Sequence, residues 1–139
     1  MHRLEKLCVW SGLALLILSG CSEDDALDIA DFEGFWLFDV VVLPDSCAGD
    51  VSGQDCLRIQ QSGRELLIVD DQSGNYVGTV EGNTATLTRD TARRSDQIVI
   101  ELGGDGQSAS GSGSEEDFDR NCITRIEFRG TRQPGGCPP

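Results

Sequence analysis

The stretch FWLFDVVVL, residues 35–43, decides the fold. Apolar side chains occupy all its positions except Asp39, including every second position from Trp36 to Val42. Because successive side chains of a β-strand point to opposite faces, such a series at every second position is typical of the buried face of a strand. The stretch therefore predicts a first strand whose buried face carries Trp36, Phe38, Val40 and Val42.

Toward the C-terminus the same alternation recurs in short runs that are separated by turn residues. The apolar members of these runs are Leu57 and Ile59; Leu66 to Val69; Tyr76, Gly78 and Val80; Ala85 and Leu87; Ile98, Ile100 and Leu102; and Ile126 with Phe128. The turn signals between them are Gln61-Ser62-Gly63, Ser73-Gly74-Asn75, Glu81-Gly82-Asn83 and Gly103-Gly104-Asp105-Gly106. No window beyond the N-terminal twenty residues has a helical period, so no helix is predicted there.

The tract Gln107 to Ser114 alternates serine with glycine or alanine. This composition fits a linker and a thin strand of small side chains about equally well, and both interpretations stay open. Counting the tract as a strand predicts an all-β, antiparallel meander of about eight short strands. A small closed barrel is the economical architecture, because closure removes exposed sheet edges.

The N-terminus reads as an export signal. Arg3 and Lys6 precede an apolar run from Leu7 to Leu18. As a helix the run would span about 18 Å, too short for the roughly 30 Å of hydrocarbon in a bilayer. A basic start followed by such a run is typical of a signal peptide, here residues 1–20.

The end of this signal, Leu18-Ser19-Gly20-Cys21, resembles the lipobox of bacterial lipoproteins. The resemblance implies cleavage before Cys21, a diacylglyceryl group on its thiol and attachment of the protein to a membrane. Ser22 stands where an aspartate would retain such a lipoprotein at the inner membrane, so the outer membrane is the implied location. The alternative is an ordinary secretory signal in which the cysteine occurs by chance. Under the lipoprotein interpretation, residues 21–31 form a lipidated acidic tether, and residues 32–139 form the domain.

Charge and composition exclude several activities. With 11 basic and 24 acidic side chains the net charge is -13, which disfavours binding to nucleic acid. His2 and Lys6 lie in the signal, so the domain has neither a histidine base nor a lysine for a Schiff base. We expect the acidic residues mainly in turns or at outward strand positions. The sequence therefore predicts a non-enzymatic protein without a cofactor.

The densest acidic cluster consists of Glu115, Glu116, Asp117 and Asp119. Its spacing does not match a calcium-binding loop, and no cysteine pair has zinc-site spacing, so no metal site is predicted.

Six cysteines are present, of which Cys8 falls in the signal and Cys21 is assigned to lipid. The remaining four, in an oxidising compartment, predict two disulfides. They are Cys47, Cys56, Cys122 and Cys137. Among the three possible pairings we favour the local one, Cys47–Cys56 with Cys122–Cys137. Two long-range pairs would instead suggest a strand count that is wrong by one.

The segment Phe32-Glu33-Gly34-Phe35-Trp36 resembles the F-x-G-x-W motif that opens the barrel of lipocalins and their calycin relatives. The resemblance implies that Trp36 plugs the base of the barrel, beneath an arginine of the last strand. Arg125, Arg129 and Arg132 are the candidates. A second family motif of the T-D-Y type is missing, and the domain is short for a lipocalin. Its size fits avidin-like barrels or the small periplasmic protease inhibitors better.

The barrel interior is the candidate binding site. Its predicted lining, whether as a filled core or around a ligand, is Trp36, Phe38, Tyr76, Ile98, Ile100, Ile126 and Phe128. We expect a monomeric envelope lipoprotein that binds a small apolar ligand in the barrel, or an envelope protein through its loops. The alternatives are a protease inhibitor of the small periplasmic type and a structural surface lipoprotein without a ligand.

Overall fold

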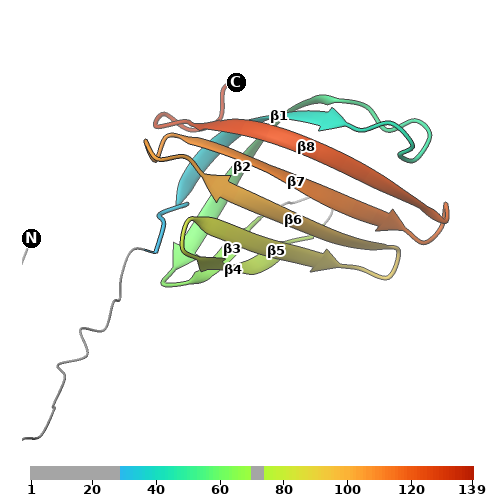
Figure 1. The fold of residues 1–139 in the computed structure, drawn as a ribbon, viewed down its shortest axis with the longest axis horizontal. Helices are drawn as coiled ribbons and strands as arrows, with labels where there is room; N and C mark the ends of the chain where they lie inside the picture. Colours follow the sequence, from blue (N-terminus) through green and yellow to red (C-terminus); the bar gives the residue numbers. More distant parts are fainter. Residues whose placement is uncertain (1–28, 70–73) are drawn as a thin grey trace, which may run out of the picture.

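The computed structural model describes residues 29–69 and 74–139. The predicted signal peptide, the predicted lipidation site Cys21 and most of the predicted tether lie outside these residues. The described chain is a closed antiparallel barrel of eight strands in sequence order, which confirms the predicted fold class (Figure 1). The strands are β1 (Gly34–Val42), β2 (Gly53–Ser62), β3 (Glu65–Ile68), β4 (Tyr76–Glu81), β5 (Thr84–Asp90), β6 (Arg94–Leu102), β7 (Ser108–Asp117) and β8 (Cys122–Arg132).

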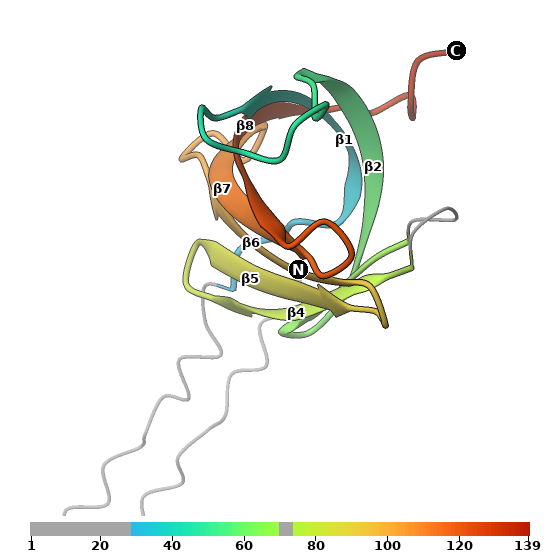
Figure 2. The same cartoon turned by 90° about the vertical axis from the view of Figure 1, so that its right-hand side faces the viewer.

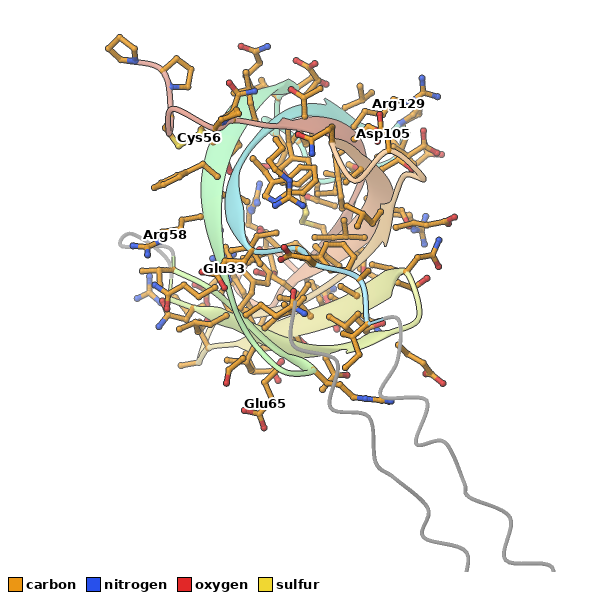
Figure 3. The ribbon with its side chains drawn as sticks, turned by 90° about the vertical axis from the view of Figure 1, so that its left-hand side faces the viewer. Glu33, Cys56, Arg58, Glu65, Asp105 and Arg129 are labelled. Carbon is orange, nitrogen blue, oxygen red and sulfur yellow. A yellow bond between two sulfur atoms is a disulfide. The ribbon has the colours of Figure 1, made fainter. Side chains whose placement is uncertain are left out.

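The first and last strands close the barrel, with Trp36 opposite Arg132 and Val42 opposite Ile126. Because every strand is antiparallel to its neighbours, the loops alternate between two ends. We call the end that receives residues 29–33 and the turns after β2, β4 and β6 the closed end (Figure 3). The opposite end, with the loops after β1, β3, β5 and β7, is the mouth (Figure 2). Across the described residues no helix has the length and apolar character needed to span a bilayer.

The serine–glycine tract forms β7, which pairs with β6 on one side and β8 on the other. Its small inward residues leave room for large neighbours. A Cβ atom on Gly111 would lie 2.7 Å from the Phe128 ring, and one on Gly113 would lie 2.7 Å from Ile98 Cγ2. The strand interpretation of this tract therefore holds, because glycine lets the neighbouring side chains occupy the space above it.

The predicted local disulfides are wrong, since the bridges are Cys47–Cys122 and Cys56–Cys137. Cys47 lies in the loop after β1 and Cys122 is the first residue of β8, and the two meet at the mouth. Cys56 lies within β2, only two strands from β8, so the C-terminal tail reaches it by passing β1. On the way the Gln133 N–H donates to the Phe35 carbonyl at 2.8 Å. Both pairs are long-range and the barrel still has eight strands, so the expected link between long-range pairing and a miscounted strand is also wrong.

Contacts with the core begin before Phe32, where the sequence places the start of the domain. Ile29 and Ala30 are partly buried against the core. The Ala30 N–H donates to the Gly82 carbonyl at 3.1 Å, and Gln61 Nε2 donates to the Ala30 carbonyl at 3.0 Å. The last residues of the predicted tether are thus held against the closed end.

Candidate functional site

The closed end is filled by aromatic side chains. Phe32 and Trp36 are fully buried. The Trp36 indole N–H donates to the Phe32 carbonyl at 2.9 Å, and the Phe32 N–H donates to Gln61 Oε1 at 2.8 Å. Trp36 therefore sits at the base of the barrel with its one polar atom satisfied.

Of the three candidate arginines, Arg132 lies over Trp36, with its guanidinium carbon 4.6 Å from the ring centre. The same guanidinium donates to the Gly106 carbonyl at 3.0 Å, to the Asp31 carbonyl at 2.6 Å and to the Glu33 carbonyl. These bonds tie the N-terminal segment to the turn between β6 and β7. Arg132 thereby seals the closed end.

The mouth half of the interior contains a cavity of about 260 Å³. Six of the seven predicted lining residues border it: Phe38, Tyr76, Ile98, Ile100, Ile126 and Phe128. Trp36 does not, because Phe38 stacks on it, with ring centres 6.1 Å apart, on the cavity side. The predicted set therefore divides between a filled base and a hollow upper half. The remaining lining residues are Val40, Asp55, Leu57, Arg89, Arg94 and Glu115.

A buried ion pair joins β5 and β6 beside this cavity. Arg89 and Asp96 are 6 % and 3 % exposed. Arg89 Nε donates to Asp96 Oδ2 at 2.6 Å, and its Nη2 forms an ion pair with the same oxygen. The guanidinium also lies over the Tyr76 ring, 4.3 Å from its centre, while the Tyr76 hydroxyl donates to Asp96 Oδ2 at 3.1 Å. Burial, reinforced by the Asp96 charge, raises the pKa of the Tyr76 hydroxyl further above neutral pH.

A second ion pair lies nearer the solvent, between Arg94 Nη1 and Glu115 Oε1 at 3.2 Å. Burial and then the charge of Asp96 raise the pKa of Glu115, against the opposing effect of Arg94. Arg89 is opposite Asp96, and Asp96 is opposite Glu115, in the register of the sheet. The charged groups therefore form one row across β5, β6 and β7.

The acidic residues were expected mainly in turns or at outward strand positions; Asp96, Glu115 and Asp117 instead face inward, and Asp55 borders the cavity. The sequence carried a signal for two charged residues of this row. Arg89 follows the inward Leu87 by two positions, and Asp96 precedes the inward Ile98 by two. Extending the two-residue period by one step places both side chains inside the barrel.

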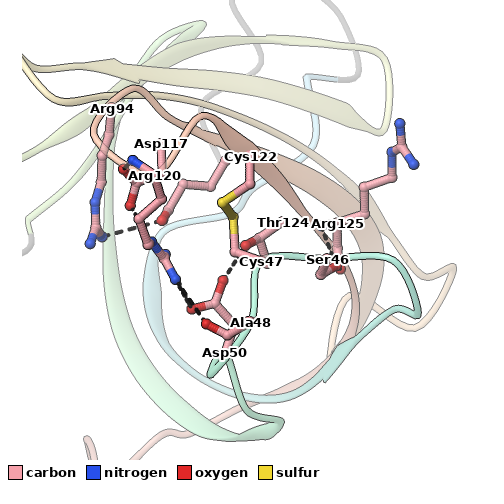
Figure 4. The surroundings of a disulfide bond; sticks show 11 residues. Ser46, Cys47, Ala48, Asp50, Arg94, Asp117, Arg120, Cys122, Thr124 and Arg125 are labelled. Carbon is pink, nitrogen blue, oxygen red and sulfur yellow. Dashed lines mark hydrogen bonds and ion pairs between the residues drawn. A yellow bond between two sulfur atoms is a disulfide. The ribbon is translucent and has the colours of Figure 1, made fainter.

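The rim of the mouth is fastened around the Cys47–Cys122 bridge (Figure 4). Arg120 contacts Asp117 Oδ2 at 2.7 Å and Asp50 Oδ1 at 3.3 Å, and Thr124 donates to Asp50 Oδ2. The hydrogen bonds from Arg120 hold the pKa of Asp117 below its usual range. These contacts anchor the loop after β1 to the hairpin between β7 and β8.

The acidic cluster of residues 115–119 is split by the strand. Glu115 and Asp117 face inward, Glu116 is exposed, and Asp119 forms an ion pair with Arg93 at 3.5 Å. Among the residues that the structure describes, no three histidine, cysteine, aspartate or glutamate side chains are grouped so as to hold a metal ion.

No family model matches the chain, and no curated protein matches its sequence. The lipoprotein and lipocalin resemblances therefore rest on the residues quoted for them.

Proposed function

We propose that this protein is a lipid-anchored lipoprotein of the bacterial outer membrane that binds a small, largely apolar ligand inside its barrel, without catalysis. The cavity beside Phe38, Ile98 and Phe128 carries the proposal. Its volume, about 260 Å³, exceeds the ~150 Å³ of an engineered cavity that binds benzene. It falls just below the ~300–1,000 Å³ of most ligand pockets. A ligand of one ring or one short alkyl chain suits this space.

The contrast between the two ends supports binding over simple packing. Unfilled volume lowers stability, by roughly 24 cal/mol per Å³ in engineered cavities. At the closed end the fully buried side chains of Phe32 and Trp36 occupy the interior. An open volume in only one half of the interior does not contribute to stability. Its presence there therefore supports a binding role for that half.

The binding step is tested with the full chain in phosphatidylcholine nanodiscs, titrated with 1-hexanol as a neutral apolar probe. We expect the methyl NMR signals of Ile98, Ile100 and Ile126 to shift, since these residues line the cavity. The signals of Ile59 and Ile68, which are fully buried but do not border the cavity, serve as internal controls. The proposal fails if the cavity signals do not move.

A matched pair of variants locates the probe. Ile126→Trp places a larger side chain in the cavity and should abolish the shifts of Ile98 and Ile100. Ile123→Trp makes the same change on β8 at a position that is 43 % exposed, and should leave them intact. Shifts that survive Ile126→Trp would place the probe elsewhere.

The anchor is tested separately by incorporation of radiolabelled palmitate in a bacterial host. Cys21→Ala should abolish the label, whereas Cys8→Ala, in the predicted signal, should retain it. Label that persists in Cys21→Ala would overturn the lipoprotein assignment.

A further inference from the structure

Three side chains that line the cavity each lie directly opposite a glycine in the register of the sheet. The pairs are Phe38 with Gly130, Phe128 with Gly111, and Ile98 with Gly113. The partners border the cavity, whereas the glycines do not, because the partner side chains cover them from inside the barrel. This part of the cavity wall therefore consists of large side chains that lie over positions without a side chain.

The partner side chains lie in the space that a Cβ atom on each glycine would take. A Cβ on Gly130 would lie 2.5 Å from Phe38 Cε1 and closer still to its Cδ1. One on Gly113 would lie 2.7 Å from Ile98 Cγ2. Cβ atoms are essentially never found within 3.0 Å of such neighbours. An alanine at either position would therefore displace the side chain opposite it.

For Phe38 this displacement is directed toward the cavity. Trp36 is fully buried and stacks on Phe38 from the closed end, with ring centres 6.1 Å apart. The Phe128 ring stands edge-on to Phe38, with ring centres 5.3 Å apart, and itself lies over Gly111. Because these neighbours are packed, the open volume beside Phe38 is the cavity.

Side chains can fill the interior of an eight-stranded barrel completely. We infer that the three glycines determine how long an apolar ligand the cavity can enclose, because they allow the side chains opposite them to lie against the wall. The glycines are positioning residues that act through those side chains. This inference rests on the proposed binding function and specifies which residues limit the size of its ligand.

A series of straight-chain alcohols from 1-butanol to 1-decanol tests the inference. Each alcohol is titrated into the full chain in phosphatidylcholine nanodiscs, with its free concentration measured because alcohols also enter the lipid. Affinity is read from the methyl NMR signal of Ile100, which borders the cavity. In the unaltered chain we expect affinity to rise about fourfold with each methylene group that the cavity encloses and to level off at a limiting length.

Alanine variants on two strands shift this limit. Gly130→Ala and Gly113→Ala should each shorten the limiting length by at least one methylene group. Affinity for the alcohol of the original limiting length should then fall about fourfold. Affinity for 1-butanol should stay unchanged, which a general loss of structure would not allow. Gly111→Ala is unsuitable, because its Cβ would also meet the backbone carbonyl of Val99.

Two further variants control for the added methyl group. Gly53→Ala adds the same group on β2, at a position where a Cβ meets nothing within 4 Å, and should leave the limiting length unchanged. Gly130→Ala/Phe38→Leu places a smaller side chain opposite the alanine and should restore the original limit. Thermal melts of all variants are measured first.

The outcomes separate the two proposals. An unchanged limiting length in folded Gly130→Ala and Gly113→Ala overturns the inference while the binding function stands. An equal shift in Gly53→Ala, no restoration in the double variant, or affinity that rises without limit through 1-decanol overturns it as well. Unfolding of both alanine variants would also count against it, because the displaced side chains would have found no open volume. If no alcohol shifts the Ile100 signal of the unaltered chain, the binding function itself fails.

Discussion

At the closed end, Phe32 and Trp36 occupy the barrel and Arg132 ties their surroundings together through backbone carbonyls. At the mouth, the inward positions of β5, β6 and β7 instead carry Arg89, Asp96 and Glu115 above a cavity. The two ends differ in their strands, because β3 pairs with β2 only at Ile59–Ser62, near the closed end, and the mouth half of β2 pairs with β1 alone among the described strands. They also differ in the side chains that point into the barrel.

The arrangement of the charged row, Arg89, Asp96 and Glu115, explains why a cavity lies beside it. Arg89, Asp96 and Glu115 are partners in the register of adjacent strands, so they pair along the wall and not across the barrel. Aromatic side chains fill the closed end because they extend inward until they meet one another. Ion pairs that run along the wall do not extend to the middle of the barrel, and the cavity lies there.

Removing the plug should have the largest effect. Trp36→Ala is expected to lower the free energy of unfolding by about 4 kcal/mol, within the ~3–5 kcal/mol range for buried aromatic residues. Ile126→Ala should cost about 2 kcal/mol or less, because Ile126 already borders open volume. Urea denaturation followed by circular dichroism measures both. Equal losses would mean that the two halves are packed alike.

Breaking the buried ion pair comes next. Arg89→Met should cost about 3 kcal/mol, because it leaves Asp96 buried without its cationic partner. The double variant Arg89→Met/Asp96→Leu should recover most of this loss, since two apolar side chains suit a buried site. Denaturation of the single and double variants gives the coupling. A double variant as unstable as the single one would show that the pair itself holds the mouth together.

Arg132→Met tests the seal at the closed end. We expect a loss of about 2 kcal/mol, from three hydrogen bonds that a charged donor makes to carbonyl groups. Hydrogen exchange of the Ala30 amide and the Trp36 indole should accelerate as the N-terminal segment loosens. Arg129→Met, an exposed position on the same strand, is the control and should change stability by less than about 0.5 kcal/mol. Similar losses of stability in both variants would show that Arg132 does not specifically hold the N-terminal segment at the closed end.

A change of pH should alter the contributions of Glu115 and Asp117 to stability in opposite directions. We expect this to be the smallest of the four effects. The folded protein binds a proton at Glu115 more tightly than the unfolded chain does, because its pKa is raised. Its contribution to stability therefore falls as pH rises from the ordinary glutamate pKa through the raised one. Asp117 has a lowered pKa, so its contribution is present above the ordinary aspartate pKa and is lost as pH falls. Denaturation against pH, repeated with Glu115→Gln and Asp117→Asn, should remove each dependence in turn.

The strands were predictable because one face of each is regularly apolar, as in Trp36 and Phe38 or Ile98 and Ile100. The serine–glycine strand was not decided by its own residues. It is a strand because it pairs with β6 and β8, where the Phe128 ring lies over Gly111. Composition alone contains no information about that neighbour.

The disulfide pairing and the charged row were missed for geometric reasons. Cys56 lies near Cys47 in sequence but within a strand, and only closure of the barrel brings the C-terminal tail beside it. Arg89 and Asp96 look like surface residues in composition. They are buried because the two-residue alternation of their strands points both side chains inward. The cost of burying each charge is offset because its partner lies directly opposite on the next strand.

Residues 29–31 are bound at the closed end, so the N-terminal segment joins the barrel at the end opposite the mouth. With the proposed lipid on Cys21, the chain from the membrane arrives beneath the plug, and the mouth opens at the far side. In this arrangement the closed end is nearer in sequence to the proposed anchor than the mouth is. Under the proposed function, the ligand entrance is therefore at the end of the barrel opposite the point where the tether attaches.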